Sequence, residues 1–307
     1  MELSPLPPYR LELTVWALRR RDRNHIDRWD GAYRRALQVG SRAIGVEVTQ
    51  HGSTSSPALT VELLSPGDHS AVELAAVRFQ VTRLLGLDVD LDGFYGLAES
   101  HGLSRPLVDR FLGVRPPRFP TLFEALCNAV ANQQLSLEVG LTLLNRLTDA
   151  LGREAPGDHG LSAFPTPEAV LAADPRDLRT MGFSSRKTEY LQGIAHAIAT
   201  GAIDGATLEA ADRTEATRDL MTLRGIGRWS AEYVLLRGLG RLDVFPGDDV
   251  GARNKLTHFL GLDHPPSYDE ITELLSPWNP YAGMLYFHLL LNGLADRGQL
   301  PDAAPCT

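Results

Sequence analysis

Short stretches of alternating hydrophobic and polar residues characterise the N-terminal part of the chain. Tyr9–Val15 and Ala58–Leu64 alternate with a period of two, which predicts half-buried antiparallel strands. From Asp68 to Leu85 the apolar residues recur at helical spacing, which predicts a helix with apolar positions at Val72, Ala75, Ala76, Phe79 and Leu84. We therefore expect residues 1–88 to form a small domain of mixed α and β structure.

After residue 88 the alternation ends, and helical periodicity continues for the rest of the chain. Proline-rich segments precede several of the periodic stretches, as is typical of helix starts. The predicted helices are Leu122–Val130, Leu135–Leu151, Pro167–Ala173, Lys187–Ala199, Thr214–Thr222, Arg228–Leu239, Val250–Leu260 and Tyr281–Leu294. Residues 89–307 are thus expected to be a helical region, with the domain boundary near Leu87–Gly93 and an alternative boundary at Arg115–Pro120.

Composition and charge exclude several classes of protein. The 307 residues are 43% hydrophobic and 22% charged, which excludes a disordered or fibrous chain. A net charge of −8 argues against coating nucleic acid through bulk electrostatics, although it leaves room for a local DNA site. The two cysteines, Cys127 and Cys306, cannot build a disulfide scaffold or a site that needs four thiolates. No signal peptide or membrane-spanning run is evident, so we expect a cytoplasmic protein.

Two features that could suggest a site have simpler interpretations. Arg19–Arg23 is basic, yet we expect a solvated run of charge at a turn or a helix start. His258 and His288 lie in apolar helical stretches without metal-ligand spacing, so we expect them in the core or at the edge of a pocket.

The segment Leu223–Tyr233, with the sequence LRGIGRWSAEY, joins two predicted helices through glycines two positions apart. Gly225 and Gly227 permit backbone conformations and close approaches that other residues do not. The amides that open the second helix can bind an anion, such as a DNA phosphate. A glycine-terminated helix followed by another helix has the same pattern, so the segment alone leaves both interpretations open.

Two acidic residues, Asp248 and Asp249, stand immediately before the predicted helix Val250–Leu260. An aspartate at this place can cap the helix, a role worth about 0.5–2 kcal/mol. It can alternatively supply a carboxylate to catalysis. This segment by itself does not decide between the two roles.

Taken together, the hairpin and the downstream aspartate resemble the helix-hairpin-helix DNA glycosylases, and most closely the 3-methyladenine DNA glycosylase II family. The resemblance implies a mainly α fold, in which a small antiparallel α+β domain similar to half of a TATA-binding protein precedes two helical subdomains. It also places the hairpin motif near residues 214–239. Further matching segments are Phe119–Leu126, Asn132–Ser136, Phe164–Glu168, Ala173–Leu178, Met181–Lys187 and Trp278–Tyr281.

The resemblance implies a catalytic role for Asp249 rather than for its neighbour. As the bond between the sugar and the base breaks, the sugar becomes oxocarbenium-like, and a carboxylate beside it stabilises that charge. Trp229, Tyr233 and Tyr281 match positions that line the family's base pocket. An indole face there would attract a cationic methylated purine by roughly 0.5–2 kcal/mol.

A flipped base leaves a gap in the duplex that the protein must fill. Gln134 matches the family's wedge position, and the adjacent Leu135 can share that role. The residues implied to bind DNA phosphate are Gly225, Gly227, Arg228 and Arg224. The reaction requires no cofactor, but backbone carbonyls of the hairpin match a structural site for Na⁺ or K⁺, formed by Met221, Leu223 and Ile226.

Trp229 stands where strand-cleaving relatives have a Schiff-base lysine, which implies a monofunctional enzyme that leaves an abasic site. Two residues depart from the family pattern. Val250 replaces the tyrosine of a relative, and Arg224 replaces the usual proline. These departures leave the exact lesion preference open.

We therefore expect a monomeric, cytoplasmic, nucleoid-associated enzyme that flips alkylated purines out of double-stranded DNA and hydrolyses their glycosidic bond. One alternative is a glycosylase for another lesion, such as hypoxanthine, uracil or an oxidised purine. The other is a helix-hairpin-helix module that binds damaged DNA without catalysis.

Overall fold

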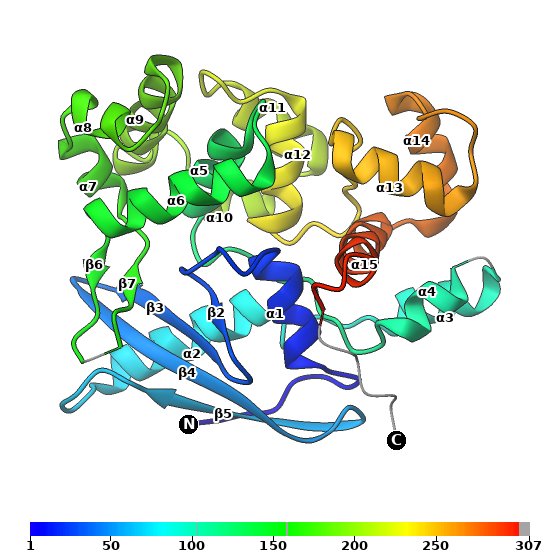
Figure 1. Cartoon of the computed structure of the whole chain (residues 1–307), viewed down its shortest axis with the longest axis horizontal. Helices are drawn as coiled ribbons and strands as arrows, with labels where there is room; N and C mark the ends of the chain where they lie inside the picture. Colours follow the sequence, from blue (N-terminus) through cyan, green and yellow to red (C-terminus); the bar gives the residue numbers. More distant parts are fainter. Residues whose placement is uncertain (103, 158, 301–307) are drawn as a thin grey trace.

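The computed structural model describes residues 1–300 apart from 103 and 158, and it combines an N-terminal sheet with a larger helical part (Figure 1). The sheet is antiparallel, with the strand order β1-β5-β4-β3-β2. Helix α2 (Ala71–Leu85) packs against it. The strands are β1 (Glu2–Leu3), β2 (Arg28–Trp29), β3 (Tyr33–Val39), β4 (Arg42–Ser53) and β5 (Ser56–Leu63).

The predicted strand at Ala58–Leu64 is confirmed as β5, whose alternation places Leu59 and Val61 in the core. The predicted strand at Tyr9–Val15 is wrong, because this segment forms most of helix α1 (Leu11–Arg19). This helix packs between two hydrophobic cores, so nearly every side chain is buried and no polar face marks it as a helix.

The predicted apolar face of α2 is confirmed at Leu84 but not at Val72 and Phe79. Val77, Val81 and Leu84 are buried against the sheet, whereas Val72 and Phe79 are 78% and 66% exposed. Two apolar stripes run along this helix, both at helical spacing, so periodicity alone does not select the one that packs.

The helical part confirms the predicted fold class. It contains α3 (Asp92–Ser100), α4 (Arg105–Arg110), α5 (Leu122–Asn132), α6 (Leu137–Leu151), α7 (Pro167–Ala172), α8 (Pro175–Thr180), α9 (Ser185–Ala199), α10 (Gly205–Ala210), α11 (Arg213–Met221), α12 (Arg228–Arg237), α13 (Val250–Leu260), α14 (Tyr268–Leu275), a 3₁₀ turn (Ser276–Trp278) and α15 (Ala282–Ala295). One short hairpin interrupts it, formed by β6 (Arg153–Glu154) and β7 (Ser162–Ala163), and this hairpin extends from α6 toward the N-terminal sheet (Figure 1).

Two hydrophobic cores position the site. The larger core joins the sheet to α5, α6, α9 and α12, and the smaller one joins α3, α4, α13 and α15. His288 is fully buried in the smaller core, as predicted, whereas His258 is exposed on α13. None of the described helices is long and apolar enough to cross a membrane. Helices α1 and α12 contribute to both cores, and the candidate site lies where the two meet.

Candidate active site

The segment between α11 and α12 forms a tight hairpin that depends on its glycines. Gly225 has a φ of +90°, and a Cβ added there would lie 2.3 Å from the ring of Tyr190. Only glycine fits this position without strain. Gly227 is the N-cap of α12, is exposed, and has open space around its Cα. Among the described residues no side chain caps α12, so the amides of its first turn lack a side-chain acceptor and can receive an anion.

The two hairpin arginines differ in their surroundings. Arg224 is strongly exposed and pairs with Glu189 at 3.1 Å. The guanidinium of Arg228 lies 3.7 Å from the ring centroid of Tyr268, and its Nε donates to Oδ2 of Asp248 at 2.7 Å. The carboxylate of Asp248 is thus paired with an arginine, and its partners differ from those of the next residue, Asp249.

Asp249 caps α13 and also contacts the aromatic residue of the hairpin. Its Oδ1 accepts the backbone N–H of Ala252 at 2.8 Å, and its Oδ2 accepts the indole N–H of Trp229 at 3.4 Å. The two roles that the sequence left as alternatives are therefore compatible in one side chain. The cap fixes one oxygen and leaves the other beside the indole.

A cavity of about 840 Å³ opens beside this carboxylate. Its aromatic wall is formed by Trp229 and Tyr233, whose ring centroids are 5.7 Å apart with a tilt of 32°. Loop, hairpin and helix residues complete the lining, among them Arg20, Arg21, Gln134, Leu135, Lys187, Asp248, Asp249, Lys255, Tyr286 and Leu290. The structure therefore brings together the predicted acid, two of the three predicted aromatic residues and both predicted wedge residues.

Tyr281 does not line this cavity. Its ring packs beside Gly93 and lies 6.2 Å from the ring of Phe94, in the smaller core. Tyr286 and Leu290 of α15 face the cavity instead. Burial raises the pKa of Tyr286, and the charge of Asp249 adds to this effect. Sequence reasoning missed these two residues because α15 is apolar on every side, which gives no signal for the face that lines a cavity.

The wedge residues lie on a loop that is held firmly in place. Gln134 has a φ of +55°, which is unusual for a residue with a side chain, and it is exposed at the cavity rim. The side chain of Gln133 donates to the carbonyl of Gly225 at 2.7 Å and so ties this loop to the hairpin. Lys187 donates to the carbonyls of Ala131 and Gln133, and burial lowers its pKa to about 8.

The arginine run near the N-terminus corrects the sequence prediction. Arg19 and Arg20 are 5% and 4% exposed, so the run is not simply solvated. Arg20 reaches the cavity and donates to the hydroxyl of Tyr233 at 3.0 Å. Arg21 also lines the cavity and pairs with Glu138 at 2.9 Å. Polar partners from distant segments hold Arg20 and Arg21 in place, and the sequence gives no sign of them.

Lys255 is the second lysine of the cavity. A Cβ added to Gly251 would lie 3.2 Å from Oδ1 of Asp249 and 3.6 Å from Nζ of Lys255, so the two charges flank this glycine. Burial lowers the pKa of Lys255, and the carboxylate of Asp249 opposes that shift. In the described part of the chain, no group of three His, Cys, Asp or Glu side chains could hold a metal ion.

Comparisons with known proteins give a consistent picture. Residues 127–280 match the family described as "HhH-GPD superfamily base excision DNA repair protein". The chain is 30% identical to DNA-3-methyladenine glycosylase 2 of Escherichia coli, over 90% of this chain and 89% of that protein. It is 33% identical to a DNA-3-methyladenine glycosylase of Bacillus subtilis, over 66% and 67% of the two chains. The solved 3-methyladenine DNA glycosylase of Archaeoglobus fulgidus is 27% identical and superimposes with a TM-score of 0.83, covering 97% of this chain and 98% of that one.

Proposed function

Because the chain belongs to the HhH-GPD superfamily of base excision DNA repair proteins, we propose that it is a DNA glycosylase for alkylated purines of the 3-methyladenine type. It binds double-stranded DNA, hydrolyses the glycosidic bond of the damaged nucleotide and leaves an abasic site. The observation that carries this proposal is the carboxylate of Asp249, which lies in an aromatic cavity and accepts the indole N–H of Trp229.

Asp249 performs its chemistry as a fixed negative charge. Rupture of the glycosidic bond leaves positive charge on the sugar, and a preorganised carboxylate stabilises that charge mainly in the transition state. The same carboxylate can orient the water that adds to the sugar and accept its proton. Its two hydrogen bonds restrict rotation, so it needs little reorganisation during the reaction.

The aromatic wall supports the binding of an extrahelical base. Trp229 and Tyr233 offer ring faces for stacking, and a cationic methylated purine gains roughly 0.5–2 kcal/mol on an indole face. Gln134 and the 42% exposed Leu135 stand at the rim, where they can occupy the gap that the flipped base leaves. The left-handed backbone of Gln134 supports this role, because such conformations concentrate at functional sites.

The hairpin supports phosphate binding through Gly225, Gly227 and the open amides of α12, with Arg224 and Arg228 beside them. If they converge on one ion, the neutral carbonyl oxygens of Met221, Leu223 and Ile226 would suit a hard monovalent cation. A bound Na⁺ or K⁺ would supply positive charge for a phosphate. Such an ion is structural, and the reaction itself needs no cofactor.

We infer that the enzyme does not cleave the strand. Trp229 offers no amine where a Schiff-base lysine is needed. Lys187 donates to the carbonyl of Ala131 in the last turn of α5 and to that of Gln133 in the wedge loop, and Lys255 donates to the carbonyl of Gly251 at 3.2 Å. Borohydride treatment of the enzyme with abasic DNA should therefore trap no covalent complex, and a trapped complex would contradict this inference.

We further propose that the protein acts as a monomer on the nucleoid in the cytoplasm, since one chain supplies acid, cavity and hairpin. The decisive experiment for the function is mass analysis of the bases released from methylated double-stranded DNA. We expect 3-methyladenine among the products. Tight binding to the lesion without any released base would instead indicate a non-catalytic binding module.

A further inference from the structure

Arg20 carries a buried guanidinium whose hydrogen-bond partners among the described residues are neutral. The residue is 4% exposed, and it lines the cavity beside Asp249. Its Nη1 donates to the hydroxyl of Tyr233 at 3.0 Å and its Nη2 to Oδ1 of Asn128 at 3.1 Å. Its Nε is buried without an acceptor in the described part of the chain. A buried charge without an ionic partner is costly, which points to a ligand that compensates it.

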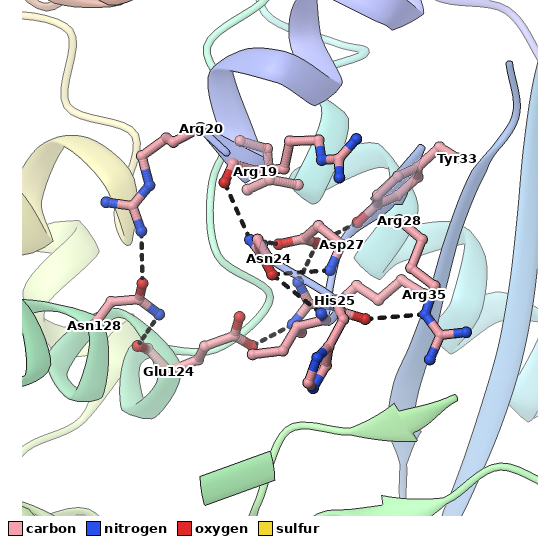
Figure 2. A network of polar contacts seen from close by, with 12 residues as sticks. Arg19, Arg20, Asn24, His25, Asp27, Arg28, Tyr33, Arg35, Glu124 and Asn128 are labelled. Carbon is pink, nitrogen blue, oxygen red and sulfur yellow. Dashed lines mark hydrogen bonds and ion pairs between the residues drawn. The ribbon is translucent and has the colours of Figure 1, made fainter. Parts of the chain in front are cut away.

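The backbone and the surrounding network hold this guanidinium in place. Arg20 has a φ of +63°, and the other described non-glycine residue with a positive φ, Gln134, lines the same cavity. Figure 2 shows Arg20 reaching across to Asn128 on α5, whose amide donates to the carbonyl of Glu124. The Glu124 carboxylate in turn pairs with Arg35 of the sheet. Arg20 is the left-handed C-cap of α1, so the end of this helix and the polar network together fix the guanidinium at the cavity.

The depth of Arg20 indicates which part of the DNA it meets. Its partner Tyr233 is 2% exposed and belongs to the aromatic wall. The hairpin amides and Arg224, which we propose to bind phosphate, are by contrast at the surface. A phosphate stays at the protein surface, whereas an extruded base enters the cavity. Arg20 therefore lies at a depth that an extruded base reaches and a phosphate does not.

Lesions differ in the charge of the base that leaves. When the glycosidic bond breaks, both electrons of the bond pass to the base. A base that is cationic through ring methylation leaves as a neutral molecule, but a neutral base such as hypoxanthine leaves as an anion that later takes a proton from solvent. Water adds to the sugar in both cases and gives up its proton to Asp249 or to solvent. A guanidinium beside the base stabilises the departing anion and disfavours a bound cation.

We propose that Arg20 is a specificity-determining residue that donates a hydrogen bond to the flipped base and raises the excision of neutral lesions relative to cationic ones. This inference rests on the proposed glycosylase function. Trp229 acts in the opposite direction, because its ring face attracts cations. The cavity thus combines a guanidinium that favours neutral lesions with an indole that favours cationic ones. The balance between the two sets which lesions are excised.

The test compares two duplexes, one with a single hypoxanthine and one with a single 7-methylguanine, under single-turnover conditions. For Arg20→Met we expect the ratio of the hypoxanthine rate to the 7-methylguanine rate to fall at least tenfold. Arg20→Lys, which keeps a cationic donor, should restore part of that ratio. Arg23→Met removes an arginine from the same run that is well exposed and lies outside the cavity, and it should leave the ratio unchanged.

The outcomes separate this inference from the proposed function. If wild-type enzyme releases 7-methylguanine but Arg20→Met lowers both rates equally, or neither, then Arg20 has only a structural role. If wild-type enzyme releases neither base nor 3-methyladenine, the glycosylase function fails and this inference fails with it. Should Arg20→Met not fold, Tyr233→Phe removes one of the two anchoring acceptors and should lower the same ratio by a smaller factor. An unchanged ratio in that variant would overturn the inference.

Discussion

The indole N–H of Trp229 points at the carboxylate of Asp249, with 3.4 Å between Nε1 and Oδ2. The aromatic wall of the cavity and the acid beside it are therefore connected directly. The other oxygen of Asp249 accepts a hydrogen bond from the backbone N–H of Ala252, in the first turn of α13. This helix therefore also fixes the Asp249 side chain. A substitution can therefore remove the negative charge of Asp249 while keeping its role as a helix cap.

Asp249→Asn should keep the fold and DNA binding but abolish most of the activity. Asparagine caps helices about as well as aspartate, so α13 should keep its start. Loss of the negative charge should slow base release from methylated DNA by about a factor of 100 or more. The measurement is single-turnover release of 3-methyladenine, together with binding to an abasic-site duplex.

Asp248→Asn is the matched control for this variant. Asp248 lines the same cavity, but its carboxylate is paired with Arg228, and we expect only a small change in the rate of base release. Equal losses in both variants, or full activity in Asp249→Asn, would refute the assignment of the catalytic acid.

Trp229→Leu should weaken the excision of cationic bases more than that of neutral ones, because it removes the ring face as well as the hydrogen bond to Asp249. Removing the ring face forfeits roughly 0.5–2 kcal/mol of cation attraction, which corresponds to a loss of about 2- to 30-fold in the rate at low enzyme concentration. Tyr281→Phe serves as the control, because Tyr281 lies in the smaller core and outside the cavity. If Tyr281→Phe lowered 7-methylguanine release as strongly, the placement of Tyr281 outside the cavity would be wrong.

Gly225→Ala should destabilise the hairpin, whereas Gly227→Ala should not. A Cβ at Gly225 meets the ring of Tyr190 at 2.3 Å and forces a side chain onto a φ of +90°. We expect a decrease of about 1–3 kcal/mol in the free energy of unfolding, measured by urea denaturation. Gly227 has an ordinary negative φ and open space, so its variant should unfold at nearly the wild-type urea concentration. Identical midpoints for Gly225→Ala and wild type would contradict the steric argument.

The prediction of the site rests on the family resemblance of several short segments rather than on any one of them alone. Asp249, Trp229 and Gln134 belong to three such segments, and the fold brings all three to one cavity. Helix α14 is not among the predicted helices, although Ser267 and Glu270 form a capping box at its start.

The rest of the site depends on contacts between distant segments. Arg20 looks like part of a solvated basic run, and only Tyr233 and Asn128, from two other helices, make its burial possible. Helix α15 is apolar all round, so its sequence cannot show that Tyr286 rather than Tyr281 faces the cavity. Tertiary packing also explains why α1 is a helix. Its alternating pattern predicts a strand, and the sequence does not show that the helix is buried on both sides.

His288 should make the stability of the protein sensitive to mild acid. It is fully buried, its Nδ1 lies 2.8 Å from the carbonyl of Met284, and burial lowers its pKa from 6.5 to about 4. As pH falls, the unfolded chain takes up this proton first, so the free energy of unfolding decreases between pH 6.5 and pH 4. From pH 7 to pH 5 this one group should remove about 2 kcal/mol. Urea denaturation at both pH values should show that loss in the wild type and a correspondingly smaller one in His288→Leu, which has no group to titrate there. Because carboxylates contribute equally to both proteins, equal losses in the two would mean that His288 is already protonated, or accessible to protons, in the folded state.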